Sequence, residues 1–344
     1  QTPDVSGFVT RLGNDTLAVE RVHREAGRIR AEVVLRVPTT SLRVYDVRLD
    51  DAGRPVTMRV ESYDPARGRA AGPVEQSEVA LDAGAGIPFI DMVHWPFELM
   101  VGRAATAPHD TVTLQLVAGR RSLPFLMTRH APDRYSAAHP TRGTMVLRAD
   151  RLGRLLELDA SRTTRALRVE RTAPPDIDAL AREFAARDAR GAGIGELSGR
   201  GEVVATIAGA EIVVDYGRPL ERGRQIFGAL VPWEQVWRTG ANRATHFSTS
   251  RDLHVGEHVI PAGVYTLFTI PRPDRWTLIV NRRTDINGLA HDPAHDLLRI
   301  DMPVRTLDQP VETFTILVEP DENGGVLRLR WDTTEAYLPF RVAG

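Results

Sequence analysis

Stretches that alternate apolar and polar residues fill the first half of the chain. Residues 42–49, for example, read LRVYDVRL. This alternation is typical of a β-strand with one face in the core and the other in water. Turn-forming stretches such as residues 13–15 (GND) and 50–53 (DDAG) separate the strands at short intervals. Because short connections favour antiparallel pairing, residues 1–172 are predicted to form a curved antiparallel β-meander, or half-barrel.

One segment, Asp82–Arg103, interrupts this pattern. It is dense in large apolar side chains and contains Phe89, Trp95, Phe97 and Met100. One interpretation is a helix or plug that fills the open side of the curved sheet, since a long sheet must hide its edges. The other is an exposed apolar patch through which these four side chains dock a partner protein. The sequence leaves both interpretations open.

A helix followed by a glycine-rich linker is predicted at residues 173–200, between two domains. Asp176 follows two prolines and suits a helix N-cap, and apolar residues then recur at helical spacing as far as Ala189. Residues 191–195 (GAGIG) end this helix. We interpret these glycines as linker and not as a phosphate-binding loop, because no predicted strand precedes them and no predicted helix follows.

Residues 201–344 again read as a series of short strands separated by turns. Their spacing predicts a β-sandwich of two antiparallel sheets. The whole chain is therefore expected to be all-β and mostly antiparallel, with few short helices.

Composition excludes several classes of function. The chain has 344 residues, of which 42% are hydrophobic and 26% charged, as in ordinary globular domains. Its net charge of −1 lacks the basic excess of nucleic-acid-binding proteins. The absence of cysteine excludes disulfides, thiolate metal sites and cysteine nucleophiles. No apolar run reaches the length of a membrane span, so we expect no transmembrane segment of its own.

The first residue, Gln1, favours a chain from which a signal peptide has been cleaved. The protein is therefore expected to be periplasmic or otherwise extracytoplasmic, and peripheral to a membrane.

An ordered motif in the second half carries a family resemblance. Its parts are Arg218-Pro219, Gly223-Arg224, Phe227-Gly228, Val231-Pro232-Trp233, residues 236–242 (VWRTGAN), Pro261-Ala262-Gly263 with Tyr265, residues 331–334 (WDTT) and Pro339-Phe340. In this order they resemble the bacterial family DUF2911, a domain of unknown function, over roughly residues 200–344. The resemblance implies a domain and an extracytoplasmic compartment, but no reaction. The N-terminal half resembles no family that we recognise.

Four histidines are weak candidates for a metal site: His254, His258, His291 and His295. The first pair flanks an expected hairpin turn, and the second pair lies in the loop HDPAH. Two or three such rings with a carboxylate suit zinc. No committed ligand spacing is present, so neither a metal nor another cofactor is expected.

A second candidate site is a binding cleft built from Trp233, Trp237, Arg238, Asn242 and Arg243. Tryptophan and arginine side chains stack on sugars, peptides and aromatic rings. The competing interpretation is that the tryptophans fill the core of the sandwich. No nucleophile elbow or other catalytic constellation is present, so no catalytic residue is predicted.

These observations favour a non-catalytic binding or assembly protein. The specific expectation is an accessory subunit docked on the periplasmic face of a larger membrane-protein complex, with electron-transport or photosynthetic complexes as candidate hosts. The alternatives are a metal-dependent hydrolase that uses the four histidines, and a carbohydrate- or peptide-binding module that uses the tryptophan cleft.

Overall fold

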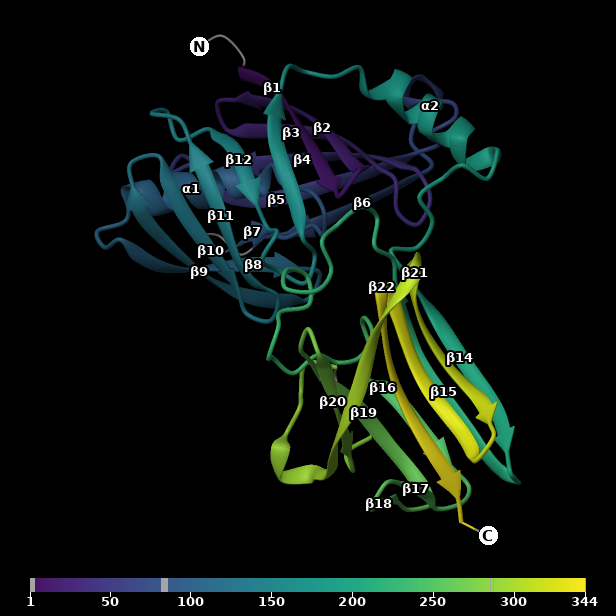
Figure 1. Cartoon of the computed structure of the whole chain (residues 1–344). Coiled ribbons are helices and arrows are strands. Elements are labelled where there is room, and N and C mark those ends of the chain that lie inside the picture. The colour runs from purple at the N-terminus through teal and green to yellow at the C-terminus, as the bar shows by residue number, and fades with distance from the viewer. Residues whose placement is uncertain (1–3, 82–85, 285, 287, 344) are drawn as a thin grey trace. The chain divides into compact units, whose positions relative to one another are not determined.

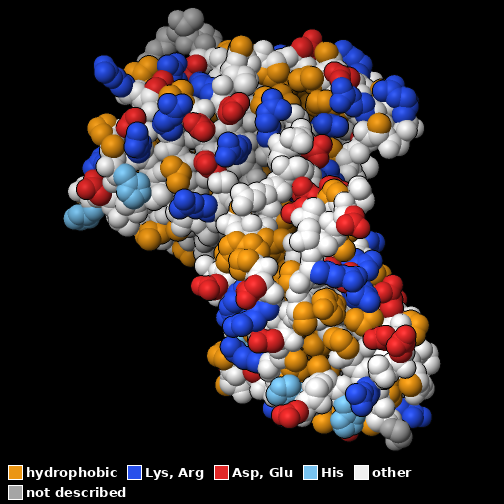
Figure 2. All heavy atoms as spheres, viewed as in Figure 1, with side chains coloured by type: hydrophobic (Ala, Val, Ile, Leu, Met, Phe, Trp, Pro, Cys, Tyr) orange, Lys and Arg blue, Asp and Glu red, His pale blue; other side chains and the backbone are white. Residues whose placement is uncertain are grey.

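A computed structural model describes residues 4–81, 86–284, 286 and 288–343. The chain divides into two compact units, Gln1–Glu196 (unit 1) and Leu197–Gly344 (unit 2). Neither helix in the described part of the chain has the length and apolar character that crossing a membrane requires. On the face seen in Figure 2, arginine and acidic side chains are interspersed over both units.

Unit 1 is built from strands, two helices and one short 3-10 turn. Its strands are β1 (Asp4–Leu12), β2 (Asp15–Glu25), β3 (Arg28–Leu35), β4 (Ser41–Leu49), β5 (Pro55–Tyr63), β6 (Glu75–Ala80), β7 (Ile87–Pro88), β8 (Thr111–Ala118), β9 (Arg121–Ala131), β10 (Arg134–His139), β11 (Gly143–Ala149), β12 (Leu155–Asp159) and β13 (Leu167–Thr172). Its helices are α1 (Pro96–Thr106) and α2 (Ile177–Ala189), and its 3-10 turn is η1 (Arg69–Ala71).

In the described residues of unit 1 the thirteen strands form one sheet, in the order β6-β5-β4-β3-β2-β1-β13-β12-β11-β10-β9-β8-β7 (Figure 1). Neighbours pair antiparallel, apart from the short parallel pair β7–β8. The sheet thus consists of two meanders joined where β1 pairs with β13, for instance at Phe8 and Arg171. It does not close, because β6 and β7 remain at its two ends. The prediction of an antiparallel meander, or half-barrel, is confirmed, and the structure adds that its sheet is open.

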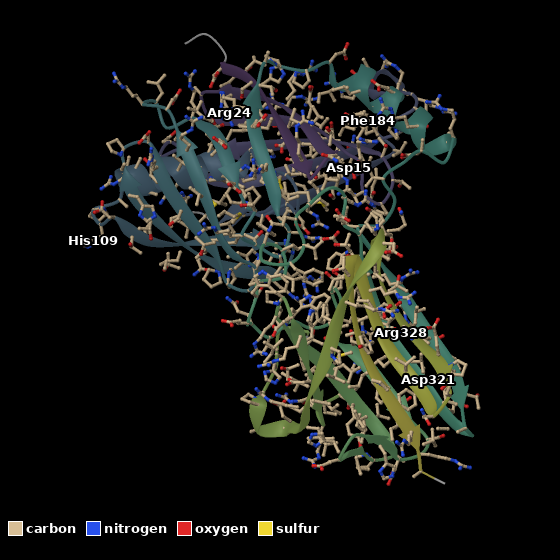
Figure 3. The ribbon with its side chains drawn as sticks, viewed as in Figure 1. Asp15, Arg24, His109, Phe184, Asp321 and Arg328 are labelled. Carbon is tan, nitrogen blue, oxygen red and sulfur yellow. The ribbon has the colours of Figure 1, made fainter. Side chains whose placement is uncertain are left out.

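The two helices of unit 1 pack on opposite faces of this sheet. Val19 of β2 packs with Phe184 of α2 (labelled in Figure 3), whereas the adjacent Glu20 bonds to the start of α1. Successive side chains of a strand point to opposite faces, so α1 and α2 cover different sides. Asp176 caps α2 by accepting a hydrogen bond from the Ala179 amide at 3.0 Å. The predicted position of this helix is therefore confirmed.

Unit 2 is also built from strands. They are β14 (Ser198–Ile207), β15 (Ala210–Pro219), β16 (Thr245–Thr249), β17 (Leu253–Val255), β18 (His258–Ile260), β19 (Gly263–Pro271), β20 (Arg275–Asn281), β21 (Asp296–Asp321) and β22 (Gly324–Val342), with one 3-10 turn, η2 (Pro293–His295). The described strands run in the order β14-β15-β16-β19-β20-β21-β22-β17-β18.

The long hairpin β21–β22 folds this sheet into two layers around one core (Figure 1). The hydroxyl of Tyr216 in β15 accepts a hydrogen bond from the Ile316 amide in β21 at 2.9 Å. The Tyr216 ring also meets Phe314 edge-on, with centroids 5.8 Å apart. Apolar side chains from both layers form one buried cluster that includes Ile212 and Leu329. The antiparallel sandwich expected from the strand spacing is confirmed.

Candidate functional site

The segment between β15 and β16, residues 220–244, is the main irregular feature of unit 2. It contains no helix and no strand beyond isolated bridges, such as the one between Trp237 and Thr269. Irregular segments of this length inside a compact domain are uncommon, and they usually serve binding or catalysis. We call this segment the recognition loop.

Strained backbone is concentrated in the recognition loop. Among the described residues, eight non-glycine residues have a positive φ, and four of them lie here: Arg222, Glu234, Thr239 and Asn242, with φ between 52° and 62°. Residues other than glycine disfavour this conformation. Non-glycine residues that adopt it are concentrated at functional sites, where contacts with the surrounding structure hold them in place. Contacts between the loop and the rest of unit 2 must therefore offset the conformational free energy that these four residues cost.

Aromatic rings form the base of the loop. Trp237 stacks on Trp331 with centroids 5.9 Å apart and meets Phe314 at 5.0 Å. Trp233 stacks on Phe227 at 5.7 Å. Large aromatic side chains contribute strongly to packing, so the loop is fixed by its own rings. The interpretation of these tryptophans as packing residues fits the contacts better than an open stacking cleft.

Hydrogen bonds attach the loop backbone to β19. The Trp237 amide donates to the Thr269 carbonyl at 2.7 Å, and the Thr269 amide donates back at 2.9 Å. The Thr239 hydroxyl donates to the Thr269 hydroxyl at 3.1 Å, and the Thr245 hydroxyl donates to the Thr239 carbonyl at 2.7 Å. Buried backbone groups need such partners, and here β19 and Thr245 of β16 supply them.

A glycine lets the loop lie directly on β15. A Cβ at Gly217 would lie 1.9 Å from the Ala241 carbonyl oxygen, so no larger residue fits without moving the loop. Gly240, with φ 154°, lies against the same strand, where a Cβ would be 2.8 Å from the Gly217 oxygen. The Arg-Thr-Gly-Ala-Asn part of the motif thus encodes a close contact between two backbones.

The five residues expected to form a binding cleft divide into two groups. Trp233, Trp237 and Arg238 are half-buried, whereas Asn242 and Arg243 are exposed. Arg238 lies across Gly288, where a Cβ would be 2.8 Å from its Cδ. Among the large hydrophobic side chains of the loop, Val236 is the exposed one, at 42%. The surface available to a ligand includes Val236, Asn242, Arg243 and the exposed residues 234 and 235.

Charged side chains close the first turn of the loop. The Arg224 guanidinium donates to the Glu221 carbonyl at 2.9 Å, and the Glu221 amide donates to the Glu312 carbonyl at 2.8 Å. Burial lowers the pKa of Arg224 to about 10, so it remains charged at neutral pH. Burial and the nearby Asp332 and Glu312 raise the pKa of the Glu221 carboxyl. The Arg224 side chain and the Glu221 backbone therefore hold this turn in place.

The four candidate histidines lie in two separate places. His254 and His258 are exposed on the β17–β18 hairpin, whereas His291 precedes η2 and His295 is its last residue. His291 pairs with Asp296 at 2.9 Å, and the neighbouring His295 pairs with Asp292 at 3.1 Å. Within the described residues, no group of three or more histidine or carboxylate side chains is placed to hold a metal ion.

The described part of the apolar segment of unit 1, residues 86–103, packs into the core as a plug and does not form an exposed docking surface. We call it the plug segment. Trp95 and Met100 are fully buried and Phe97 is 3% exposed, so these three are not available to a partner protein. Phe89 is half-buried. The start of the segment, residues 82–85, lies outside the described residues.

Buried polar groups fasten this plug to the sheet. The Glu20 carboxyl group accepts hydrogen bonds from the His94 and Trp95 amides, at 2.8 and 3.0 Å, just before α1 begins. Glu98 of α1 accepts bonds from Arg171 at 2.7 Å and from the Leu155 amide at 2.9 Å. Glu98 also pairs with Arg24, which is labelled in Figure 3. Amide groups near a helix N-terminus favour such acceptors. The buried aromatic side chains therefore lie beside hydrogen-bonded polar groups that hold the helix to the sheet.

Sequence reasoning did not identify the polar residues around Phe89. Asp91 of the plug segment pairs with Arg142 at 2.8 Å and also with Arg165. His139 packs beside them, with its ring centroid 5.7 Å from that of Phe89. These residues are far apart in the sequence and share no motif, so only the fold brings them together.

Comparison with known proteins agrees with the motif. No curated protein matches the chain. The N-terminal half has no family match. Residues 198–340, the C-terminal part of the chain, match the family described as "Protein of unknown function (DUF2911)", which confirms the resemblance seen in the ordered motif.

Proposed function

We propose that this protein is a non-catalytic binding and assembly protein, and that the recognition loop of unit 2 is its contact surface. The observation that carries the proposal is the loop itself. Four left-handed non-glycine residues are held over a base of aromatic rings, while Val236, Asn242 and Arg243 remain exposed. A rigid irregular loop on a β-sandwich is a common way to present a binding surface.

The contacts of the charged residues also favour binding over catalysis. Catalysis by general acids and bases needs a donor or acceptor within reach of a substrate. The Arg224 guanidinium instead bonds to the Glu221 carbonyl of its own turn. His291 and His295 each pair with a neighbouring aspartate.

In the specific form of the proposal, the protein is an accessory subunit on the extracytoplasmic face of a membrane-protein complex. A partner of the loop is expected to offer an apolar contact for Val236 and an acidic or hydrogen-bonding group for Arg243 and Asn242. Protein interfaces commonly combine such an apolar centre with a polar rim.

A pull-down from native membranes in mild detergent tests the proposal. The wild-type protein is expected to capture a fixed set of membrane proteins at constant stoichiometry. The variant Val236→Asp should lose them, because it places a charge at the apolar centre of the contact. The matched control is Val264→Asp, which changes another exposed valine of unit 2, 58% exposed on β19.

Either of two outcomes would contradict the proposal. Equal capture by the Val236→Asp variant would remove the loop as the contact surface. A free monomer that carries stoichiometric metal would favour the hydrolase alternative instead. Cell fractionation of the same strain tests the extracytoplasmic location.

A further inference from the structure

A pocket in unit 1 lies where the plug segment meets two turns of the sheet. Its walls come from residues 89–97, from the β10–β11 turn and from the β12–β13 turn. The Thr164 amide donates to the Arg142 carbonyl at 3.0 Å and joins the two turns. At Gly143 a Cβ would lie 3.0 Å from the Arg162 oxygen, so the turns approach each other closely. The pocket is therefore part of the fixed structure of the half-barrel.

The polar side of the pocket carries one excess positive charge. Asp91 pairs with both Arg142 and Arg165, whose side chains are 29% and 30% exposed. The two guanidiniums lower the pKa of Asp91, so it is a carboxylate at neutral pH. Each guanidinium has five N–H donors, and one carboxylate cannot occupy all of them. The arrangement suits one further carboxylate beside Asp91.

His139 adds a neutral donor to the same wall. Its Nδ1 accepts a hydrogen bond from the Thr141 amide at 3.1 Å, which places the ring proton on Nε2. Burial and the nearby Arg142 lower the pKa of His139 to about 4, so the ring is neutral at pH 7. Nε2 is buried and has no hydrogen-bond partner among the described residues. Buried donors rarely remain without an acceptor, so this atom marks a place for one.

The remaining wall is apolar and locally strained. Phe89, Phe97, Met145 and Leu167 line it, and Arg142 lies over the Phe89 ring at 5.8 Å. Met92, which also lines the pocket, has a φ of 65°. Left-handed non-glycine residues tend to occur at ligand sites. The hollow is small, which favours a short ligand over a lipid chain.

We infer that this pocket binds a small monocarboxylate with a short apolar chain. The carboxylate lies against Arg142 and Arg165 and accepts the Nε2–H of His139, while the chain packs on Phe89 and Phe97. This site is in unit 1 and does not depend on the function proposed for the recognition loop. It gives the protein a ligand-binding activity in addition to its proposed assembly role.

Titration of the 15N-histidine-labelled full-length chain with butyrate tests the inference. We expect a saturable shift of the His139 side-chain nitrogen resonance. Matched probes are 1-butanol and butylamine, which keep the chain but replace the carboxylate with a neutral or a cationic group. Neither is expected to produce a saturable shift, because neither offers the guanidiniums a negatively charged pair of acceptor oxygens.

Variants separate the site from general effects on folding. Arg165→Gln is expected to weaken butyrate binding about tenfold, since it removes one charged hydrogen-bond donor group. His139→Phe keeps the ring packing and removes the donor, and should weaken binding less, as measured by calorimetry. Arg148→Gln is the control, because its side chain is 56% exposed on β11 and pairs with Glu157.

Three results would contradict the proposed carboxylate site. The inference is wrong if butyrate gives no saturable shift at His139, or if 1-butanol gives the same one. It is also wrong if Arg165→Gln binds butyrate like the wild type. If Arg165→Gln does not fold, butyrate binding is measured for Arg165→Lys and His139→Phe instead. Wild-type affinity in both variants would contradict the inference.

Discussion

Two aromatic-rich segments of this chain differ in how far their side chains are buried. In unit 1 Trp95 and Phe97 are buried inside the half-barrel, whereas the recognition loop of unit 2 keeps its tryptophans half-buried. The loop also presents Val236, Asn242 and Arg243 to solvent. Each segment contains three phenylalanine or tryptophan residues. What distinguishes them is the backbone: the plug segment forms the helix α1, while the loop stays irregular and bonds to β19. A helix satisfies most of its own backbone groups, whereas the irregular loop depends on partners from a neighbouring strand.

The largest effect is expected for the variant Trp95→Ala, which tests whether the plug segment belongs to the core of unit 1. Trp95 is fully buried, and removing such a side chain is expected to destabilise unit 1 by about 3–5 kcal/mol. Hydrogen exchange of peptides from residues 86–106 in a urea series reports this change for unit 1 alone. The control Leu152→Ala, at a site 78% exposed, should change stability by roughly 0.5 kcal/mol or less. Unchanged stability together with lost partner capture would restore the docking interpretation for the plug segment.

The corresponding test in unit 2 is Gly217→Ala. The new Cβ would lie 1.9 Å from the Ala241 oxygen, so the loop must lift off β15. We expect a loss of about 3 kcal/mol, the upper range for overpacking, measured by hydrogen exchange of peptides from residues 228–244. Gly199→Ala in the adjacent strand β14 is the matched control, because its Cβ would have no neighbour within 4 Å. If both variants behave alike, the loop is not held by β15.

A pH series sharpens the account of how the plug is anchored. Burial raises the pKa of Glu20 from 4.5 to about 8, and burial lowers the pKa of His94 from 6.5 to about 4. Between pH 4 and 6.5 the unfolded chain holds the His94 proton and the folded chain does not, so this group makes stability rise with pH. Between pH 4.5 and 8 the folded chain holds the Glu20 proton and the unfolded chain does not, so this group makes stability fall with pH.

Above pH 6.5 only the Glu20 effect remains of these two. Unit 1 is therefore expected to lose roughly 2 kcal/mol between pH 6.5 and 8, at about 1.4 kcal/mol per pKa unit. Hydrogen exchange of the His94 and Trp95 amides is the local measurement, since both donate to Glu20. In Glu20→Gln this slope should disappear, whatever its stability at pH 6.5. An unchanged slope in that variant would show that another group titrates.

The general fold could be predicted from sequence because its signals are local. Alternation marked the strands, and Asp176 with the apolar spacing up to Ala189 marked α2 at its observed bounds. The turn stretch at residues 13–15 is also where the chain turns between β1 and β2, at Gly13, where φ is 55°.

The sites were harder to predict because they depend on contacts between distant residues. The motif identified the recognition loop, yet not that Trp237 would stack on Trp331, since that requires the sandwich to close. Likewise Asp91, His139 and Arg165 meet only after the half-barrel has formed around the plug. Such three-dimensional juxtapositions leave no spacing to read in a single sequence.

The most direct test of the central claim is hydroxyl-radical footprinting of the free protein and of the complex captured from native membranes. The account predicts that Trp95 and residues 96–100 are protected in both states, whereas residues 228–243 are labelled in the free protein and protected in the complex. Labelling of Trp95 in the free protein, or a footprint that leaves residues 228–243 unchanged on capture, would contradict it.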